Sequence, residues 1–117
     1  MDEVKRHEVG PRMSQMVACG NMVYTAGVVA LRAPGKPVGE QTADILAKID
    51  DLLAAGGTDK SKILTATIWL SDISSFAEMN RVWDSWVVPG STPCRACVEA
   101  KLAGSEYTVE IQVTAVR

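Results

Sequence analysis

The sequence has few cysteines, few aromatic residues and no long apolar run. Only three of its 117 residues are Cys, an odd number that is too low for a disulfide framework. No stretch approaches the roughly 20 apolar residues that are needed to cross a bilayer. The first ten residues, MDEVKRHEVG, are too polar for the apolar core of a signal peptide. We therefore expect a protein that does not enter the membrane and stays in the cytoplasm.

An excess of basic charge is also missing, because 12 Lys and Arg stand against 14 Asp and Glu, for a formal net charge of −2. The densest basic spot, Lys60 and Lys62, has Asp59 beside it. Nucleic-acid-binding proteins cluster their basic residues, so we expect no nucleic-acid partner. The 47% hydrophobic and 22% charged residues are typical of a globular domain. We expect one domain over residues 1–117 that is small enough to favour oligomerisation.

Cys94 and Cys97 have the C-x-x-C spacing of some zinc and redox sites. A structural zinc site needs two further ligands, and only Cys19 and His7 remain to supply them. A thioredoxin-type pair lies at the start of a helix, whereas this pair lies inside a strand pattern. We therefore expect no metal site, and we interpret Cys94 as a small core residue.

The N-terminal half predicts a hairpin, a loop and a helix. Residues 14–19 and 22–31 are strand-like, and Gly20-Asn21 between them is a two-residue turn signal because Gly tolerates positive φ. The segment 32–39 contains two Pro and two Gly and is expected to be a loop. Apolar residues recur at helical spacing over 40–55, and Gly56-Gly57 ends that helix.

A strand and a second helix are expected next. The strand, 63–71, has an apolar face and a mixed face; the apolar face holds Leu64, Ala66, Ile68 and Leu70, and the mixed face Ile63, Thr65, Thr67 and Trp69. The helix begins at Ser75, where Ser75-x-x-Glu78 matches a capping box. Trp83 and Trp86 could form a ligand platform, but their helical spacing favours a place in the core.

The last two strands contain the candidate chemistry. Residues 94–102 and 107–115 alternate apolar and polar side chains. The short gap between them suits an antiparallel hairpin. If the apolar faces point to the core, one surface of the sheet carries the polar set Arg95, Cys97, Glu99, Glu110 and Gln112. This set has two interpretations: a solvated polar face, or an Arg that grips a substrate carboxylate beside a Glu that acts as a general base.

Several segments resemble the Rid family (RidA/YjgF, formerly grouped with endoribonuclease L-PSP). They are GNMVYTAG (20–27), VGEQTADILAKIDDLLAAGG (38–57), KILTATIWLSDISSFAEMNRVWDSW (62–86), PCRACVEAKL (93–102) and VEIQVTAV (109–116). The resemblance implies an α+β, chorismate-mutase-like domain with a mixed six-stranded sheet and two helices on one face. It also implies a homotrimer with clefts between subunits, in which the mixed face of strand 63–71 is buried.

The activity that the resemblance implies is hydrolysis of imines and enamines, such as 2-aminoacrylate and 2-iminopropanoate, to 2-keto acids and ammonia without a cofactor. Residue by residue, Arg95 matches the carboxylate-binding arginine and Glu110 the glutamate that positions water. Cys97 matches a position whose backbone contacts the substrate, and Asn80 and Gly27 match further cleft positions.

Two positions depart from the family pattern. The usual G-P-Y-S-Q reads Gly-Pro-Arg-Met-Ser-Gln at 10–15, and Ala26 stands where many members have Ser before the cleft glycine. Both changes remove a hydroxyl that could orient water or substrate. Two other functions therefore stay open: a non-catalytic 2-keto acid binder, and an RNA-acting inhibitor of translation, which the acidic composition disfavours.

Overall fold

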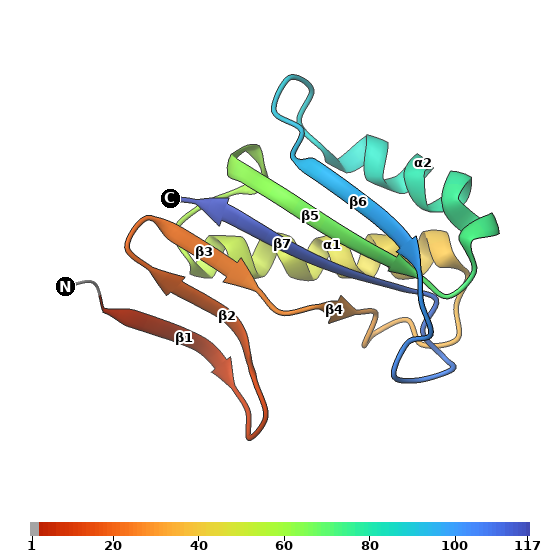
Figure 1. Cartoon of the computed structure of the whole chain (residues 1–117), viewed down its shortest axis with the longest axis horizontal. Coiled ribbons are helices and arrows are strands. Elements are labelled where there is room, and N and C mark those ends of the chain that lie inside the picture. Colours follow the sequence, from red (N-terminus) through yellow and green to blue (C-terminus); the bar gives the residue numbers. More distant parts are fainter. Residues whose placement is uncertain (1–2) are drawn as a thin grey trace.

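The fold is one mixed seven-stranded sheet with two helices. The computed structural model describes residues 3–117. The elements in chain order are β1 (Val4–Val9), β2 (Ser14–Cys19), β3 (Met22–Thr25), β4 (Val28–Val29), α1 (Val38–Ala55), β5 (Ile63–Leu70), α2 (Phe76–Trp86), β6 (Cys94–Glu99) and β7 (Val109–Val116). The strand order is β1-β2-β3-β7-β5-β6, and the short β4 also pairs with β7. In Figure 1, α1 crosses behind β5 and β7, and α2 lies next to α1.

This architecture confirms the expected α+β class with two helices, but the sheet has seven strands and not six. The additional edge strand is β1, whose side chains are all exposed. Because none of its positions is buried, its sequence lacks the alternation by which strands are recognised. In addition, the expected strand 22–31 is interrupted after Thr25, so that it forms β3 and β4.

The predicted turn and helix ends agree closely with the structure. The β2–β3 hairpin turns at Gly20, which has a φ of 60°. Helix α1 starts at Val38, two residues before the predicted start, and the carboxylate of Glu78 accepts a hydrogen bond from the Gly39 N–H at 2.8 Å. Glu78 therefore caps α1 and not its own helix. The prediction of a capping box at Ser75 was wrong, because the Ser75 side chain makes no cap hydrogen bond.

The core lies between the helices and one face of the sheet. Trp83 and Trp86 are 5% and 9% exposed, which confirms that they belong to this core. Most of the largest fully buried side chains come from α1, α2, β5 and β7, and they include Ile45, Leu46, Ile49, Leu52, Leu53, Ile68, Leu70, Met79 and Ile111. Neither α1 nor α2 is long and apolar enough to span a membrane.

Strand β5 begins with an irregularity that the alternation pattern missed. A register shift against β7 lies between Ile63 and Thr65. As a result Ile63 is 5% exposed and joins the core, while Leu64 is 44% exposed. The prediction had these two residues on the opposite faces. From Ala66 onward the predicted alternation is correct.

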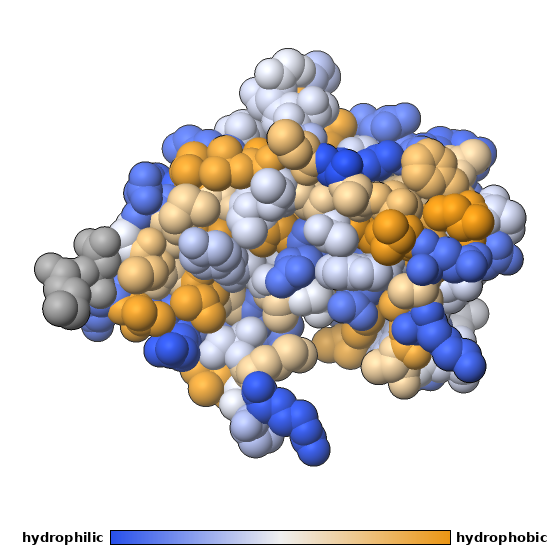
Figure 2. Space-filling model, viewed as in Figure 1, coloured by the Kyte–Doolittle hydropathy of each residue, from blue (hydrophilic) through white to orange (hydrophobic). Residues whose placement is uncertain are grey.

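The second face of the sheet is not covered by the helices. It carries Thr67 and Trp69 of β5 and Glu110 and Gln112 of β7, which pair across the two strands. Figure 2 looks onto this face and shows apolar side chains interspersed with polar ones. We refer to it as the open face. Tyr24, which pairs with Thr114, and Val98, which pairs with Trp69, are 44% and 48% exposed on it.

Candidate functional site

Arg95 belongs to β6, and its side chain lies between this strand and α2. Strand β6 pairs in parallel with β5, and Arg95 stands opposite Ala66, whose side chain is buried under the helices. The Arg95 side chain therefore extends toward α2. Its Nη1 donates a hydrogen bond to Oδ1 of Asn80 at 2.7 Å. Its guanidinium carbon is 5.6 Å from the centre of the Phe76 ring and 5.4 Å from that of Trp83.

The guanidinium of Arg95 has no carboxylate partner within residues 3–117, where the ion pairs join other residues. Within the same described residues, one of its five N–H donors has a hydrogen-bond partner, which is Asn80. The amide of Asn80 and the two rings replace part of the hydration of this partly buried cation, but none of these partners carries a negative charge. The arrangement thus favours binding of an anion, and a carboxylate fits the planar fork of a guanidinium.

Cys97 follows Arg95 on the same side of β6, opposite Ile68. Burial raises the pKa of its thiol, and the nearby charge of Arg95 opposes this shift only in part. The thiol is therefore protonated at neutral pH and is a poor nucleophile. This fits a residue that contributes its backbone rather than its sulfur.

The two cysteines of the C-x-x-C spacing face opposite sides of β6. Cys94 pairs with Thr65 and is exposed on the open face, so the prediction of a core position for Cys94 was wrong. All three cysteines are free. Within residues 3–117 no group of three His, Cys, Asp or Glu side chains is placed to hold a metal ion.

Glu110 lies on the open face, between Val29 of β4 and Trp69 of β5. Its carboxylate passes directly beside Gly27, where any Cβ atom would collide with Oε2 of Glu110. Gly27 lies in the break between β3 and β4. The absence of a side chain at Gly27 therefore leaves the space that the Glu110 carboxylate occupies.

The structure divides the predicted site residues into two groups. Arg95, Asn80 and Cys97 lie beside α2, whereas Glu110 and Gly27 lie on the open face. The prediction that all polar residues of the last two strands share one surface was wrong. The reason is topological: β5 lies between β6 and β7, so residues 100–108 cross over β5 and do not form a hairpin.

Two other members of the predicted polar surface have structural roles. Glu99 accepts a hydrogen bond from the Ile73 N–H at 3.0 Å and so fixes the turn that leads into α2. Gln112 donates to the Thr25 carbonyl at 3.3 Å. Glu99 lies on the α2 side of the sheet and Gln112 on the open face.

Phe76 and Trp83 were not recognised as site residues from the sequence. The apolar face predicted for this helix comprises Phe76, Met79, Trp83, Trp86 and Val87, and its helical spacing favours packing into the core. A usable signal was present, since Phe76, Asn80 and Trp83 follow an i, i+4, i+7 spacing and so share one side of α2. All three contact Arg95.

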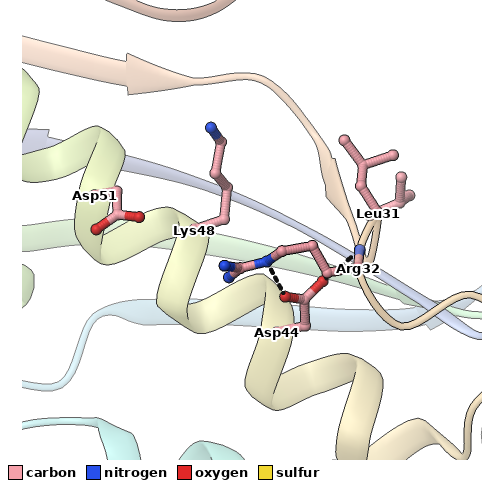
Figure 3. Close-up of a pocket in the computed structure, with 6 residues that line it drawn as sticks. Leu31, Arg32, Asp44, Lys48 and Asp51 are labelled. Atoms are coloured by element: carbon pink, nitrogen blue, oxygen red, sulfur yellow. Dashed lines mark hydrogen bonds and ion pairs between the residues drawn. The ribbon is translucent and has the colours of Figure 1, made fainter.

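A separate cavity of about 210 Å³ lies between β4 and α1 and is shown in Figure 3. Its basic groups already have partners. Arg32 is bound to Asp44 at 2.9 Å. Lys48 contacts Glu8 of β1 at 2.7 Å. The positive charge of this cavity is therefore largely neutralised, which makes it a poorer anion site than the surroundings of Arg95.

Comparison with known proteins gives consistent matches over nearly the whole chain. The family model described as "Endoribonuclease L-PSP" matches residues 6–117. The RutC family protein YoaB of Escherichia coli is 43% identical over 113 residues, which are 96% of each chain. The Reactive Intermediate Deaminase A of Arabidopsis thaliana chloroplasts is 27% identical over 112 residues, which cover 92% of this chain and 59% of the relative.

The fold also matches a solved structure. A crystal structure of a member of the YjgF protein family from Neisseria meningitidis superimposes with a TM-score of 0.94. It is 45% identical in sequence, and the match covers 98% of this chain and 95% of that one.

Proposed function

Because the chain belongs to the endoribonuclease L-PSP family, whose members also have the names YjgF and RutC, we propose that it hydrolyses reactive 2-imino acids and their enamine tautomers to 2-keto acids and ammonia. The observation that supports this most is the unpaired, partly buried Arg95 guanidinium held by Asn80. The name of the Arabidopsis relative agrees with this chemistry.

In the proposed reaction, Arg95 binds the substrate carboxylate through two N–H donors. The backbone at Cys97 and the amide of Asn80 line the same place. Glu110 holds a water molecule and takes a proton from it as the water oxygen bonds to the imine carbon. Glu110 gives this proton to the imine nitrogen, which leaves a tetrahedral carbon that bears a hydroxyl and an amino group. Glu110 then takes the hydroxyl proton and passes it to the amino nitrogen, so that the carbon–oxygen double bond forms as the carbon–nitrogen bond breaks and ammonia leaves. The product is the 2-keto acid.

This mechanism requires a site formed by two subunits. The carboxylate and the reacting carbon of a 2-imino acid are directly bonded to each other, so one small molecule cannot contact both faces of a sheet. Arg95 and Glu110 lie on opposite faces within one chain. We therefore propose that Arg95 of one subunit faces Glu110 of the next. The exposed Tyr24 and Val98 on the open face would be buried in that contact, and the family resemblance favours a trimer.

Subunit mixing tests this arrangement. We expect a trimer mass in sedimentation equilibrium at micromolar concentration. Arg95→Ala and Glu110→Gln trimers, each of low activity, are unfolded together and refolded at equal amounts. Random assembly in a closed ring makes about three quarters of the trimers mixed, and each mixed trimer has one intact site of three. About one quarter of the wild-type activity should therefore return.

The same experiment separates this arrangement from its alternatives. If Arg95 and Glu110 acted within one subunit, no mixed trimer would contain an intact site, and activity would stay at the level of the two parent variants. A monomer mass at micromolar concentration would also contradict the shared site. Wild-type protein that has been unfolded and refolded alone is the control for recovery.

A 2-keto acid binder without turnover is the second candidate. Ala26 precedes Gly27 where many family members have Ser, and no Tyr occurs in residues 10–15. Both differences remove hydroxyl groups near the proposed water. An enzyme releases many ammonia molecules per subunit, whereas a binder saturates at one ligand per site. The name of the family model raises action on RNA as a third possibility, but the net charge of −2 disfavours binding to RNA phosphates.

A further inference from the structure

We propose that Phe76 and Trp83 are positioning residues that hold the Arg95 guanidinium ready for a substrate carboxylate without occupying its hydrogen-bond donors. This inference rests on the proposed function, because it concerns the same carboxylate site. We refer to the two rings as the aromatic clamp. Phe76 lies at the start of α2 and Trp83 two turns further along the same side of the helix.

The geometry around Arg95 differs from that of an ordinary arginine in a protein. The two rings are 5.6 Å and 5.4 Å from its guanidinium carbon, within the range of a cation–π interaction. Asn80 fixes one Nη1 donor at 2.7 Å. The aromatic clamp restricts the position of the cation by its ring faces, while the Asn80 amide fixes the rotation of the guanidinium in its plane.

A carboxylate side chain is the usual partner of an arginine, but such a partner beside Arg95 would compete with the substrate carboxylate. A carboxylate partner consumes two N–H donors and cancels the charge. In this chain the Asp44 carboxylate accepts from the Nε and from the backbone N–H of Arg32 and so balances the charge of that guanidinium. An aromatic face attracts the cation but accepts no conventional hydrogen bond from it. Arg95 therefore keeps its full charge and most of its donors for a ligand.

The exposure of Phe76 supports a role outside the core. Phe76 is 38% exposed, whereas Met79 on the same helix is fully buried at 0%. Burial of the Phe76 ring in the core therefore does not explain its place beside Arg95. Trp83 serves the core as well, since it is 5% exposed and lies 5.5 Å from the ring of Trp86.

Binding of 2-oxobutanoate to the intact protein tests the clamp. Phe76→Leu keeps an apolar side chain but removes the ring face, and we expect its Kd to rise about fivefold. Phe76→Tyr keeps the ring face and should restore wild-type affinity. In the hydrolysis reaction, KM should rise in Phe76→Leu while kcat stays unchanged, because Glu110 and its water are not affected.

Two tryptophan variants form a matched pair. Trp83→Leu and Trp86→Leu both replace a buried indole of α2 by an aliphatic side chain, but of the two residues Trp83 is the one whose ring contacts Arg95. Trp86 donates instead to Asp50 at 3.1 Å. We expect Kd to rise in Trp83→Leu and to stay at the wild-type value in Trp86→Leu, even where both lower the melting temperature. Equal rises in the two variants would mean a general loosening of α2 and would overturn the clamp.

A ligand-free measurement separates failure of the clamp from failure of the proposed function. In the NMR spectrum, ring currents should shift the Arg95 Nε–H proton, and Phe76→Leu should move it toward its random-coil position. An unchanged Arg95 resonance and an unchanged Kd in Phe76→Leu would overturn the clamp. A different result is that Phe76→Leu loses the ring-current shift of Arg95 while Arg95→Ala binds 2-oxobutanoate as tightly as the wild type. That result would leave the clamp standing and remove the carboxylate-binding role of Arg95.

Discussion

Replacement of Glu110 by Gln is expected to lower kcat for imine hydrolysis by about 10²-fold or more. Glutamine keeps the shape of the side chain and can still hold a water molecule by a hydrogen bond, but it cannot accept a proton from that water. Because the carboxylate of the substrate is bound by Arg95, the variant should still bind 2-oxobutanoate with wild-type affinity. Steady-state kinetics and a binding titration on the same preparation measure the two quantities.

The alternative role for Glu110 is that of an ion-pair partner for Arg95 across the subunit contact. In that case Glu110→Gln would change binding along with turnover, because Arg95 would lose its counter-charge. Near-normal turnover would remove Glu110 from the mechanism. The exposed Glu40 on α1 provides the control, since Glu40→Gln changes the net charge by the same amount without altering Glu110.

Gly27→Ala gives an independent approach to the same carboxylate. A Cβ at position 27 would collide with Oε2 of Glu110. The end of a glutamate side chain is flexible, so the chain should still fold while the carboxylate moves. We expect kcat to fall in Gly27→Ala with little change in 2-oxobutanoate affinity, as in Glu110→Gln.

Replacement of Arg95 by Ala is expected to lower kcat/KM for 2-imino acids by at least about tenfold. Hydrogen bonds to charged groups contribute about 1.5–3 kcal/mol each, and about 1.4 kcal/mol corresponds to a factor of ten. Arg95→Lys should restore only part of the loss, because the ammonium group lacks the planar fork. In contrast to Glu110→Gln, Arg95→Ala should weaken binding of 2-oxobutanoate.

The matched control for Arg95 is Arg32, which lies at the cavity of Figure 3. Arg32→Ala removes an arginine that is already paired with Asp44 and should leave kcat/KM unchanged. If Arg32→Ala abolished 2-oxobutanoate binding and a folded, trimeric Arg95→Ala did not, the ligand site would be that cavity. Sedimentation and the melting temperature show whether each variant remains assembled and folded.

The local elements of this fold follow from the sequence because their signals are local. Helix α1 is defined by apolar residues at helical spacing between Pro37 and Gly56, and the β2–β3 turn by Gly20-Asn21. The strand order is not local. The short gap between the predicted strands 94–102 and 107–115 favoured a hairpin, but β6 ends at Glu99 and pairs with β5. Nothing in residues 100–108 reveals that choice.

The orientation of β6 was missed for a related reason. Alternation shows which side chains share a face, and an apolar set normally faces the core. In β6 the opposite holds: Ala96 and Val98 lie on the open face, while Arg95 and Cys97 face α2. One face of β6 lies toward α2, and the other lies in the proposed subunit contact, so both faces are withdrawn from water. The polarity of the side chains alone therefore does not show which face points to α2.

The most direct test of the proposed activity uses an imine made in the reaction vessel. An L-amino-acid oxidase converts L-leucine to its 2-imino acid, which semicarbazide traps as an absorbing semicarbazone. Wild-type protein should slow semicarbazone formation in proportion to its concentration and speed ammonia release, with hydrogen peroxide production unchanged. Glu110→Gln should do neither at the same concentration. Semicarbazone formation that proceeds equally with and without wild-type protein, over a series of oxidase substrates, would contradict the assignment as an imine deaminase.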